Sequence, residues 1–137
     1  MDRRYDVLDS NNLLNDSNWA LLKAALFRIR NTQGPSKRQN DREFLTAIIY
    51  LVKTGDSWRQ LPKFFGEWSA VYMRFRRWES SRTWAYLWRE LKQDSLIEIM
   101  ALFLDSDFDA HPADDIAHKR HLSVAERLRN AVRMVVW

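Results

Sequence analysis

Apolar residues recur along this chain with the three- and four-residue spacing of amphipathic helices. The first such series consists of Trp19, Leu22 and Leu26. Asn15 stands where its side chain can cap the free N–H groups of the following turn, and the series ends near Arg30. The polar stretch 31–39, which contains a Gly-Pro pair, predicts a loop after this helix.

The most apolar segment of the chain follows this loop. Asn40 and Glu43 have the spacing of a capping box, and Gly55 has the backbone freedom to end a helix. Between these signals, most of a helical circumference is covered by Phe44, Leu45, Ile48, Ile49, Leu51 and Val52. A helix that is apolar on most sides is buried, so the pattern predicts the central helix of the fold.

Residues 57–78 have the spacing of a helix-turn-helix. A short helix over 57–61 is stopped by Pro62, and Gly66 supplies the permissive backbone that a turn needs. Ser69 is placed to cap a second helix that runs to the end of this segment.

The second helix of this motif has an apolar face and a polar face. The apolar face consists of Val71, Phe75 and Trp78. The opposite face consists of Ser69, Met73, Arg76 and Arg77. Tyr72 flanks this outer face, whereas Arg74 lies nearer the seam, where it could reach a phosphate or an internal carboxylate. A DNA-reading helix needs such a division, and a surface helix with solvated arginines is the alternative.

Charge is distributed unevenly along the chain. The net charge is +4, yet residues 57–92 hold eight basic and three acidic side chains, and residues 93–115 hold seven acids and no Lys or Arg. A basic block followed by an acidic one indicates a polyanion-binding module joined to a separate element. We therefore predict DNA contacts from Arg59, Lys63, Ser69, Tyr72, Met73, Arg74, Arg76 and Arg77.

Two later segments complete an all-α fold. A helix over 82–92 has an apolar stripe formed by Trp84, Leu87, Trp88 and Leu91, a spacing that favours core tryptophans over base-stacking platforms. Ser123 and Glu126 have capping-box spacing at the start of a C-terminal amphipathic helix. Its stripe of Val124, Leu128, Val132 and Val135 needs a partner, either the core of this domain or another subunit. The remaining faces of that helix carry Arg127, Arg129 and Arg133.

Three blocks follow one another in a recognisable order. They are NDREFLTAIIY (40–50), TGDSWRQLP (54–62) and FGEWSAVYMRFRRW (65–78). Together they resemble the N-terminal domain of bacterial insertion-sequence transposases of the IS-five group, over about residues 14–104. The resemblance implies a helical DNA-binding domain that recognises the inverted repeats at the ends of the element. We expect residues 1–95 to form this domain and residues 96–137 to form a divergent extension.

In that family an RNase H-like domain follows, whose first strand ends in a catalytic Asp followed by Ser. Residues 97–104 with Asp105 and the next Ser resemble this junction, but Asp107 replaces the usual Thr and nothing after His111 is similar. Two-metal phosphoryl transfer needs several converging carboxylates, and the family's other acids would lie beyond Trp137. The resemblance therefore implies a shortened chain without independent catalysis, in which Asp105 is a vestigial metal ligand and no cofactor is expected.

The acidic segment also has the spacing that begins a calcium-binding loop, with Asp105, Asp107 and Asp109 at positions 1, 3 and 5. Position 6 is Ala110 where the loop needs Gly, and position 12 is Ile116 where it needs Glu. A solvated acidic loop is the preferred interpretation. The alternative is adventitious binding of a divalent metal, together with His111, His118 and His121.

The composition excludes several classes of protein. No uninterrupted apolar run exceeds six residues and the first 25 residues lack a signal-peptide pattern, so we expect a cytoplasmic protein without a membrane-spanning helix. The absence of Cys excludes disulfides, thiol nucleophiles and Cys-based metal sites.

The leading hypothesis is a sequence-specific binder of double-stranded DNA, of transposase origin and without catalysis. A second copy of the chain or a full-length transposase is a further partner. The main alternative is a protein-interaction or regulatory module, in which the aromatic block is only core and the C-terminal helix docks onto a transposase or another copy. A complete enzyme is the third option, and no nucleophile-base set supports it.

Overall fold

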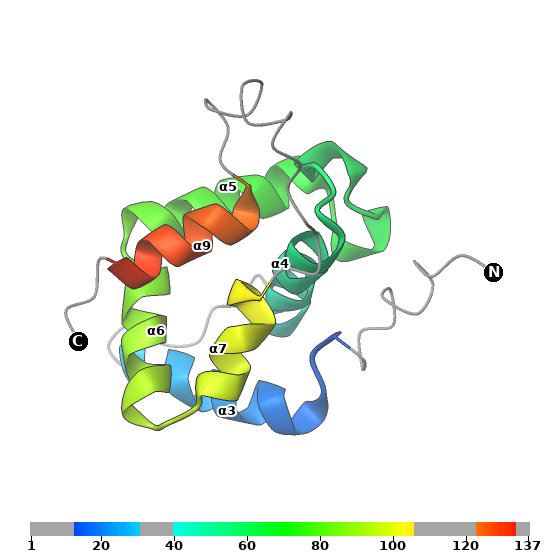
Figure 1. Cartoon of the computed structure of the whole chain (residues 1–137). Helices are drawn as coiled ribbons and strands as arrows, with labels where there is room; N and C mark the ends of the chain where they lie inside the picture. The colour runs from blue at the N-terminus through cyan, green and yellow to red at the C-terminus, as the bar shows by residue number, and fades with distance from the viewer. Residues whose placement is uncertain (1–12, 31–39, 106–122, 134–137) are drawn as a thin grey trace.

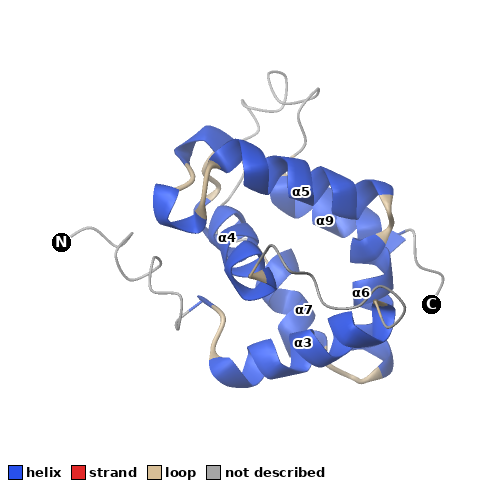
Figure 2. Cartoon of the chain, turned by 180° about the vertical axis from the view of Figure 1, so that it is seen from behind, coloured by secondary structure: helices blue, strands red, loops and turns tan. Residues whose placement is uncertain are grey.

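Every regular element that the structure describes is helical. The structure is a computed structural model that describes residues 13–30, 40–105 and 123–133. Within these ranges it contains six α-helices and two 3-10 turns, and no strand (Figures 1 and 2). The predicted all-α fold is confirmed. The loop predicted over 31–39 lies outside the described residues.

The most buried helix is α4 (Asp41–Thr54), which lies between the helices at the top and those at the bottom of Figure 1. The Asn40 side chain accepts a hydrogen bond from the Glu43 backbone N–H at 3.2 Å, which satisfies a free donor at the helix start. Gly55 ends the helix at φ 70°, in the left-handed region that favours glycine. All residues from Phe44 to Val52 are buried, as the apolar pattern predicted.

One flank of the fold is formed by α3 (Asp16–Ile29) and α6 (Thr83–Gln93), which pack against each other. Asn15 caps α3 by accepting a hydrogen bond from the Asn18 backbone N–H at 2.8 Å, and Arg30 follows the last helical turn. Both predicted ends of this helix are confirmed.

A cluster of aromatic rings joins α6 to α5 (Trp68–Ser80) in the core. The ring centroid of Trp84 lies 4.8 Å from that of Trp78, 5.5 Å from that of Phe75 and 5.6 Å from that of Trp88. Each such side chain buries roughly 150–250 Å² and contributes strongly to a small core. The predicted core position of these tryptophans is confirmed, since Trp84 and Trp88 are fully buried.

The segment before Asp105 corrects one implication of the family resemblance. It forms α7 (Ile97–Leu104), not a strand. Ile99, Met100 and Phe103 are buried at helical spacing. A short apolar run fits a helix or a strand equally well in the sequence. Here contacts with α4, α6 and the C-terminal helix α9 (Val124–Arg133) cover one helical face and decide the outcome.

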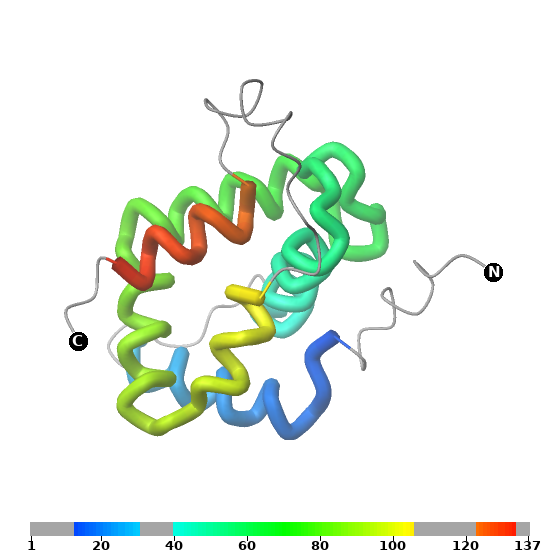
Figure 3. The backbone as a smooth tube through the Cα atoms, in the orientation of Figure 1, coloured from blue at the N-terminus to red at the C-terminus, as the bar shows by residue number. Residues whose placement is uncertain are grey.

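The last described helix, α9 (Val124–Arg133), returns to lie beside α5 and α6 (Figure 3). The Ser123 Oγ accepts a hydrogen bond from the Glu126 backbone N–H at 3.2 Å. Val124 and Leu128 are buried in the same hydrophobic core as the side chains of α4 and α6. Of the two partners left open for this stripe, the domain's own core is therefore the one observed. Val135 lies outside the described residues, and the division at residue 95 stays a prediction.

Candidate nucleic-acid interface

Two 3-10 turns lead into α5. They are η1 (Trp58–Gln60) and η2 (Lys63–Phe65), separated by Leu61 and Pro62. The short helix predicted over 57–61 is therefore present only as a 3-10 turn of three residues. Proline disfavours the helical conformation in the residue before it, which leaves room for one tight turn only.

The start of α5 also differs from its prediction. The N-cap residue is Glu67, whose side chain makes no capping hydrogen bond, and Ser69 lies within the first helical turn. Gly66 has φ 106° and an extended ψ, and Glu67 already has the extended conformation of an N-cap. The helix therefore begins before Ser69 can cap it.

The two faces of α5 are confirmed. The buried face holds Val71, Phe75 and Trp78, and the exposed face holds Ser69, Met73, Arg76 and Arg77. The Trp58 ring of η1 packs edge-on against Phe75, with centroids 5.3 Å apart. The apolar rear thus fixes the direction in which the outer side chains point.

Arg74 is the one predicted DNA contact that the fold turns inward. Its side chain is buried, forms an ion pair with Asp41 and lies with its guanidinium carbon 4.4 Å from the centre of the Phe44 ring. Asp41 also accepts a hydrogen bond from Arg30 Nη1 at 2.8 Å. Burial, together with the charges of Arg30 and Arg77, lowers the pKa of Arg74 to about 10. The internal carboxylate of Asp41 is therefore the partner of Arg74, and Arg74 is not part of the candidate interface.

Tyr72 is half-buried between η1 and α9. Its ring centroid lies 5.1 Å from that of Trp58 and 5.8 Å from the guanidinium carbon of Arg127. Arg127 Nε donates to a Glu79 carboxylate oxygen at 2.9 Å, and Nη2 donates to the other oxygen. These hydrogen bonds raise the pKa of Arg127. Only part of Tyr72 is available to a ligand, and its ring helps hold α9 against α5.

Four cations of η1, η2 and α5 have no carboxylate partner among the described residues. They are Arg59, Lys63, Arg76 and Arg77, and all four are exposed. The Arg59 guanidinium carbon lies 5.3 Å from the centre of the Trp68 ring, which places this cation beside the start of α5. Other arginines pair with acids, such as Arg28 with Glu90 at 3.1 Å. Uncompensated positive charge therefore collects along this part of the fold.

The sequence patterns did not single out one exposed aromatic residue near this surface. Phe64 is 55% exposed and packs at a tilt against the buried Phe65, with ring centroids 4.3 Å apart. Both residues belong to η2, and in the sequence nothing separates an outward ring from an inward one in so short a turn.

A cavity of about 330 Å³ lies behind this surface, between the start of α4 and the start of α5. Its lining consists of Asn40, Glu43, Phe44, Phe65, Gly66, Ala70, Val71 and Arg74. Two of its polar groups already have structural partners, because Asn40 caps α4 and Arg74 pairs with Asp41. The cavity is thus less suited to an anion than the exposed cations are.

The acidic segment gives no metal site within the described ranges. There, no group of three or more His, Cys, Asp or Glu side chains could hold a metal ion. Asp105 is exposed at the end of α7, and its backbone oxygen accepts a hydrogen bond from Lys53 Nζ at 3.5 Å. Asp107, Asp109 and the three histidines lie outside the described residues, so the calcium-loop and adventitious-metal interpretations stay untested.

These features define a small helical domain in which one helix, α5, has an apolar buried face and a cationic exposed face. Residues 14–88, more than half of the chain, match the family described as "Putative transposase of IS4/5 family (DUF4096)". The chain belongs to this family. The matched region runs from the start of α3 through η1, η2 and α5 into α6.

A relative from Sinorhizobium fredii (strain NBRC 101917 / NGR234), the uncharacterized protein y4sN, is 33% identical over 66 residues. This alignment covers 47% of the chain and 51% of the relative, so the chain spans about half the length of the curated relative it matches. No solved structure matches the chain. Among the described helices, none is both long and apolar enough to cross a membrane.

Proposed function

We propose that this protein binds double-stranded DNA in a sequence-specific way and that the outer face of α5 enters the major groove. The observation that carries the proposal is the set of exposed cations in η1, η2 and α5 that have no acidic partner in the described part of the chain. Phosphate neutralisation by such side chains releases counterions and supplies most of the affinity of a DNA-binding protein.

The contacts divide into two kinds according to their position. Arg76 and Arg77 point outward from a helix whose rear is buried, so their guanidinium groups can donate to guanine edges in the groove. Arg59 and Lys63 lie in the turns before the helix, where phosphate contacts would fix its register. Ser69 and Met73 complete the exposed face and add smaller polar and apolar contacts.

The family match supports a proposal for the biological identity of this DNA. We infer that the target is the inverted repeat at the ends of an insertion element, and that the protein acts in the cytoplasm on DNA transposition or recombination. On its own, the protein neither cleaves nor joins DNA strands. A second copy or a full-length transposase would supply the remaining functions. The rival interaction module has less support, because the described part of the α9 stripe is packed in the core.

Selection from randomised duplexes tests the sequence preference. The purified chain is incubated with a pool of duplexes that contain about 20 random base pairs, and bound DNA is amplified over several rounds. We expect one motif to be enriched and Arg76→Ala or Arg77→Ala to relax the preference at particular positions. Salt-sensitive binding without any enriched motif would refute specificity, and an unbound pool would refute DNA binding itself.

A further inference from the structure

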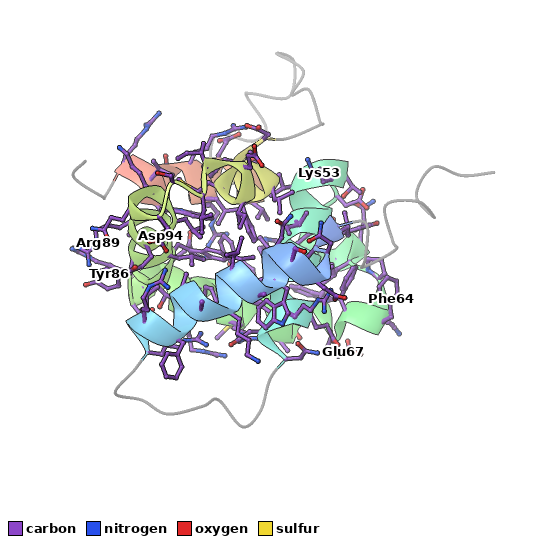
Figure 4. All side chains as sticks on the ribbon, turned by 90° about the horizontal axis from the view of Figure 1, so that it is seen from below. Lys53, Phe64, Glu67, Tyr86, Arg89 and Asp94 are labelled. Atoms are coloured by element: carbon purple, nitrogen blue, oxygen red, sulfur yellow. The ribbon has the colours of Figure 1, made fainter. Side chains whose placement is uncertain are left out.

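The exposed side of α6 carries a second basic and aromatic surface. Tyr86 and Arg89 lie three residues apart on α6, and Arg82 is the N-cap residue directly before this helix. All three side chains are exposed, and we call these three residues the α6 stripe. The Arg89 guanidinium carbon lies 5.3 Å from the centre of the Tyr86 ring. Figure 4 shows Tyr86 and Arg89 pointing outward at the end of the molecule opposite Phe64.

The acids that could neutralise this stripe are already paired. Glu90 and Asp94 both accept hydrogen bonds from Arg28 of α3. Arg82 and Arg89 have no carboxylate partner among the described residues. The stripe therefore offers two uncompensated guanidinium groups whose residues are about 10 Å apart along the helix axis.

The backbone at Arg82 supports a role for its side chain. Arg82 has φ 62° and ψ 22°, in the left-handed region, and its side chain does not cap α6. Glycine adopts this conformation without the steric cost that any other L-residue bears. A strained backbone at a residue whose side chain has no carboxylate partner in the described ranges favours a functional role for that residue.

The position of the stripe relative to α5 favours the phosphates of DNA as the partner. Only Ser81 and Arg82 separate α5 from α6, so the stripe begins where the outer face of α5 ends. Arg59 and Lys63 lie before the N-terminal end of α5. A helix in the major groove is bordered by a phosphate backbone on each side of a groove about 12 Å wide. The 13 residues of α5 span about 20 Å, which exceeds this width, so cations beyond both ends of a helix that crosses the groove lie beside the phosphate backbones.

We propose that Arg82 and Arg89 bind phosphates of the same duplex, and that the Tyr86 ring holds the Arg89 guanidinium in position. This proposal rests on the proposed function and extends its surface from α5 to α6. Phosphate contacts orient a protein on the duplex without reading its sequence. The α6 stripe is therefore a positioning surface for the reading helix.

The salt dependence of duplex binding tests this proposal. For the full chain, Arg82→Gly and Arg89→Gln should each reduce the slope of log affinity against log salt by about 0.9, and the double variant by about twice that. The loss should be equal on selected and scrambled duplexes. Arg82→Gly suits the left-handed backbone, so its thermal unfolding midpoint should not fall. Lys23→Gln, an exposed position on α3, removes the same charge and should leave the slope unchanged.

A double-mutant cycle tests the part played by Tyr86. Tyr86→Ala should weaken binding of the parent chain but add little in the Arg89→Gln background, because the ring acts through that guanidinium. Additive losses would overturn the positioning role. Unchanged slopes in the Arg82 and Arg89 variants, with binding still weakened by Arg76→Ala, would overturn the α6 contact and leave the proposed function standing. Absence of binding by the parent chain would overturn both.

Discussion

The arginines of this fold have two different uses, which depend on whether a carboxylate lies within reach. Arg74 and Arg77 lie three residues apart on α5, yet Arg74 is buried against Asp41 whereas Arg77 is exposed without an acidic partner in the described residues. Removal of one partner of a buried ion pair destabilises the fold, because it leaves an uncompensated buried charge, whereas an exposed cation remains available to an external anion.

Breaking the internal pair should destabilise the fold. Asp41→Asn leaves the buried guanidinium of Arg74 without its counterion and also removes a partner of Arg30. We expect the free energy of unfolding to fall by about 3–5 kcal/mol, measured by urea denaturation. Arg77→Ala is the matched control and should change stability by less than about 0.5 kcal/mol. Equal stability of the two variants would show that the pair does not hold α4 to α5.

The exposed arginines should affect DNA binding without affecting folding. Arg76→Ala or Arg77→Ala should cost about 1–3 kcal/mol of binding free energy if the lost contact is to a base, and should relax preference at one position. Loss of a phosphate contact would instead weaken all sequences alike. Competition titrations with single-base variants of the selected duplex separate these cases. No loss in either variant would exclude both residues from the interface.

The helical phase of these arginines could be predicted from the sequence, but the partner of Arg74 could not. At 100° per residue, Arg76 and Arg77 fall on the outer face and Arg74 on the seam. Asp41, the acid that settles the position of Arg74, lies 33 residues earlier in the chain. Only the packing of α4 against α5 brings the two side chains together.

At the scale of elements, α5 depends on its buried rear for its orientation. Phe75 is fully buried and contacts the rings of Trp58 and Trp84, with centroids 5.3 and 5.5 Å away. Phe75→Ala should lower the free energy of unfolding by about 3–5 kcal/mol through a core cavity, measured by chemical denaturation. A variant that folds normally but no longer binds DNA would mean that the two faces of α5 are assigned the wrong way round.

Most helices could be predicted because their caps and apolar spacing agree. Asn15, Asn40 and Ser123 each accept a hydrogen bond from a backbone N–H three residues on. The failures have local causes. Pro62 limits η1 to one turn, and the short apolar run of α7 has no period long enough to exclude a strand.

At the scale of the whole molecule, the described helices share one hydrophobic core. The acidic side chains of the described residues do not converge on one site that could hold a metal ion. Asp105 is exposed at the end of α7, and a lone carboxylate cannot hold the two metal ions that stabilise attacking and leaving oxygens. We therefore expect no nicking or joining of duplexes with candidate terminal repeats in Mg²⁺ or Mn²⁺, assayed on denaturing gels. Asp105→Asn should leave DNA affinity nearly unchanged. Metal-dependent cleavage that is abolished by this substitution would contradict this expectation and show that the chain is catalytic.

The most direct test of the central claim, that the cations of η1 and α5 hold duplex DNA, is the salt dependence of binding measured by fluorescence anisotropy. We expect the affinity of the parent chain to fall steeply between about 50 and 200 mM salt, with a slope near 0.9 per phosphate contact. The triple variant Arg59→Gln, Arg76→Gln, Arg77→Gln should bind more weakly with a shallower slope. Undetectable binding by the parent chain at about 50 mM salt, or equal affinities and slopes for the parent and the triple variant, would contradict the claim.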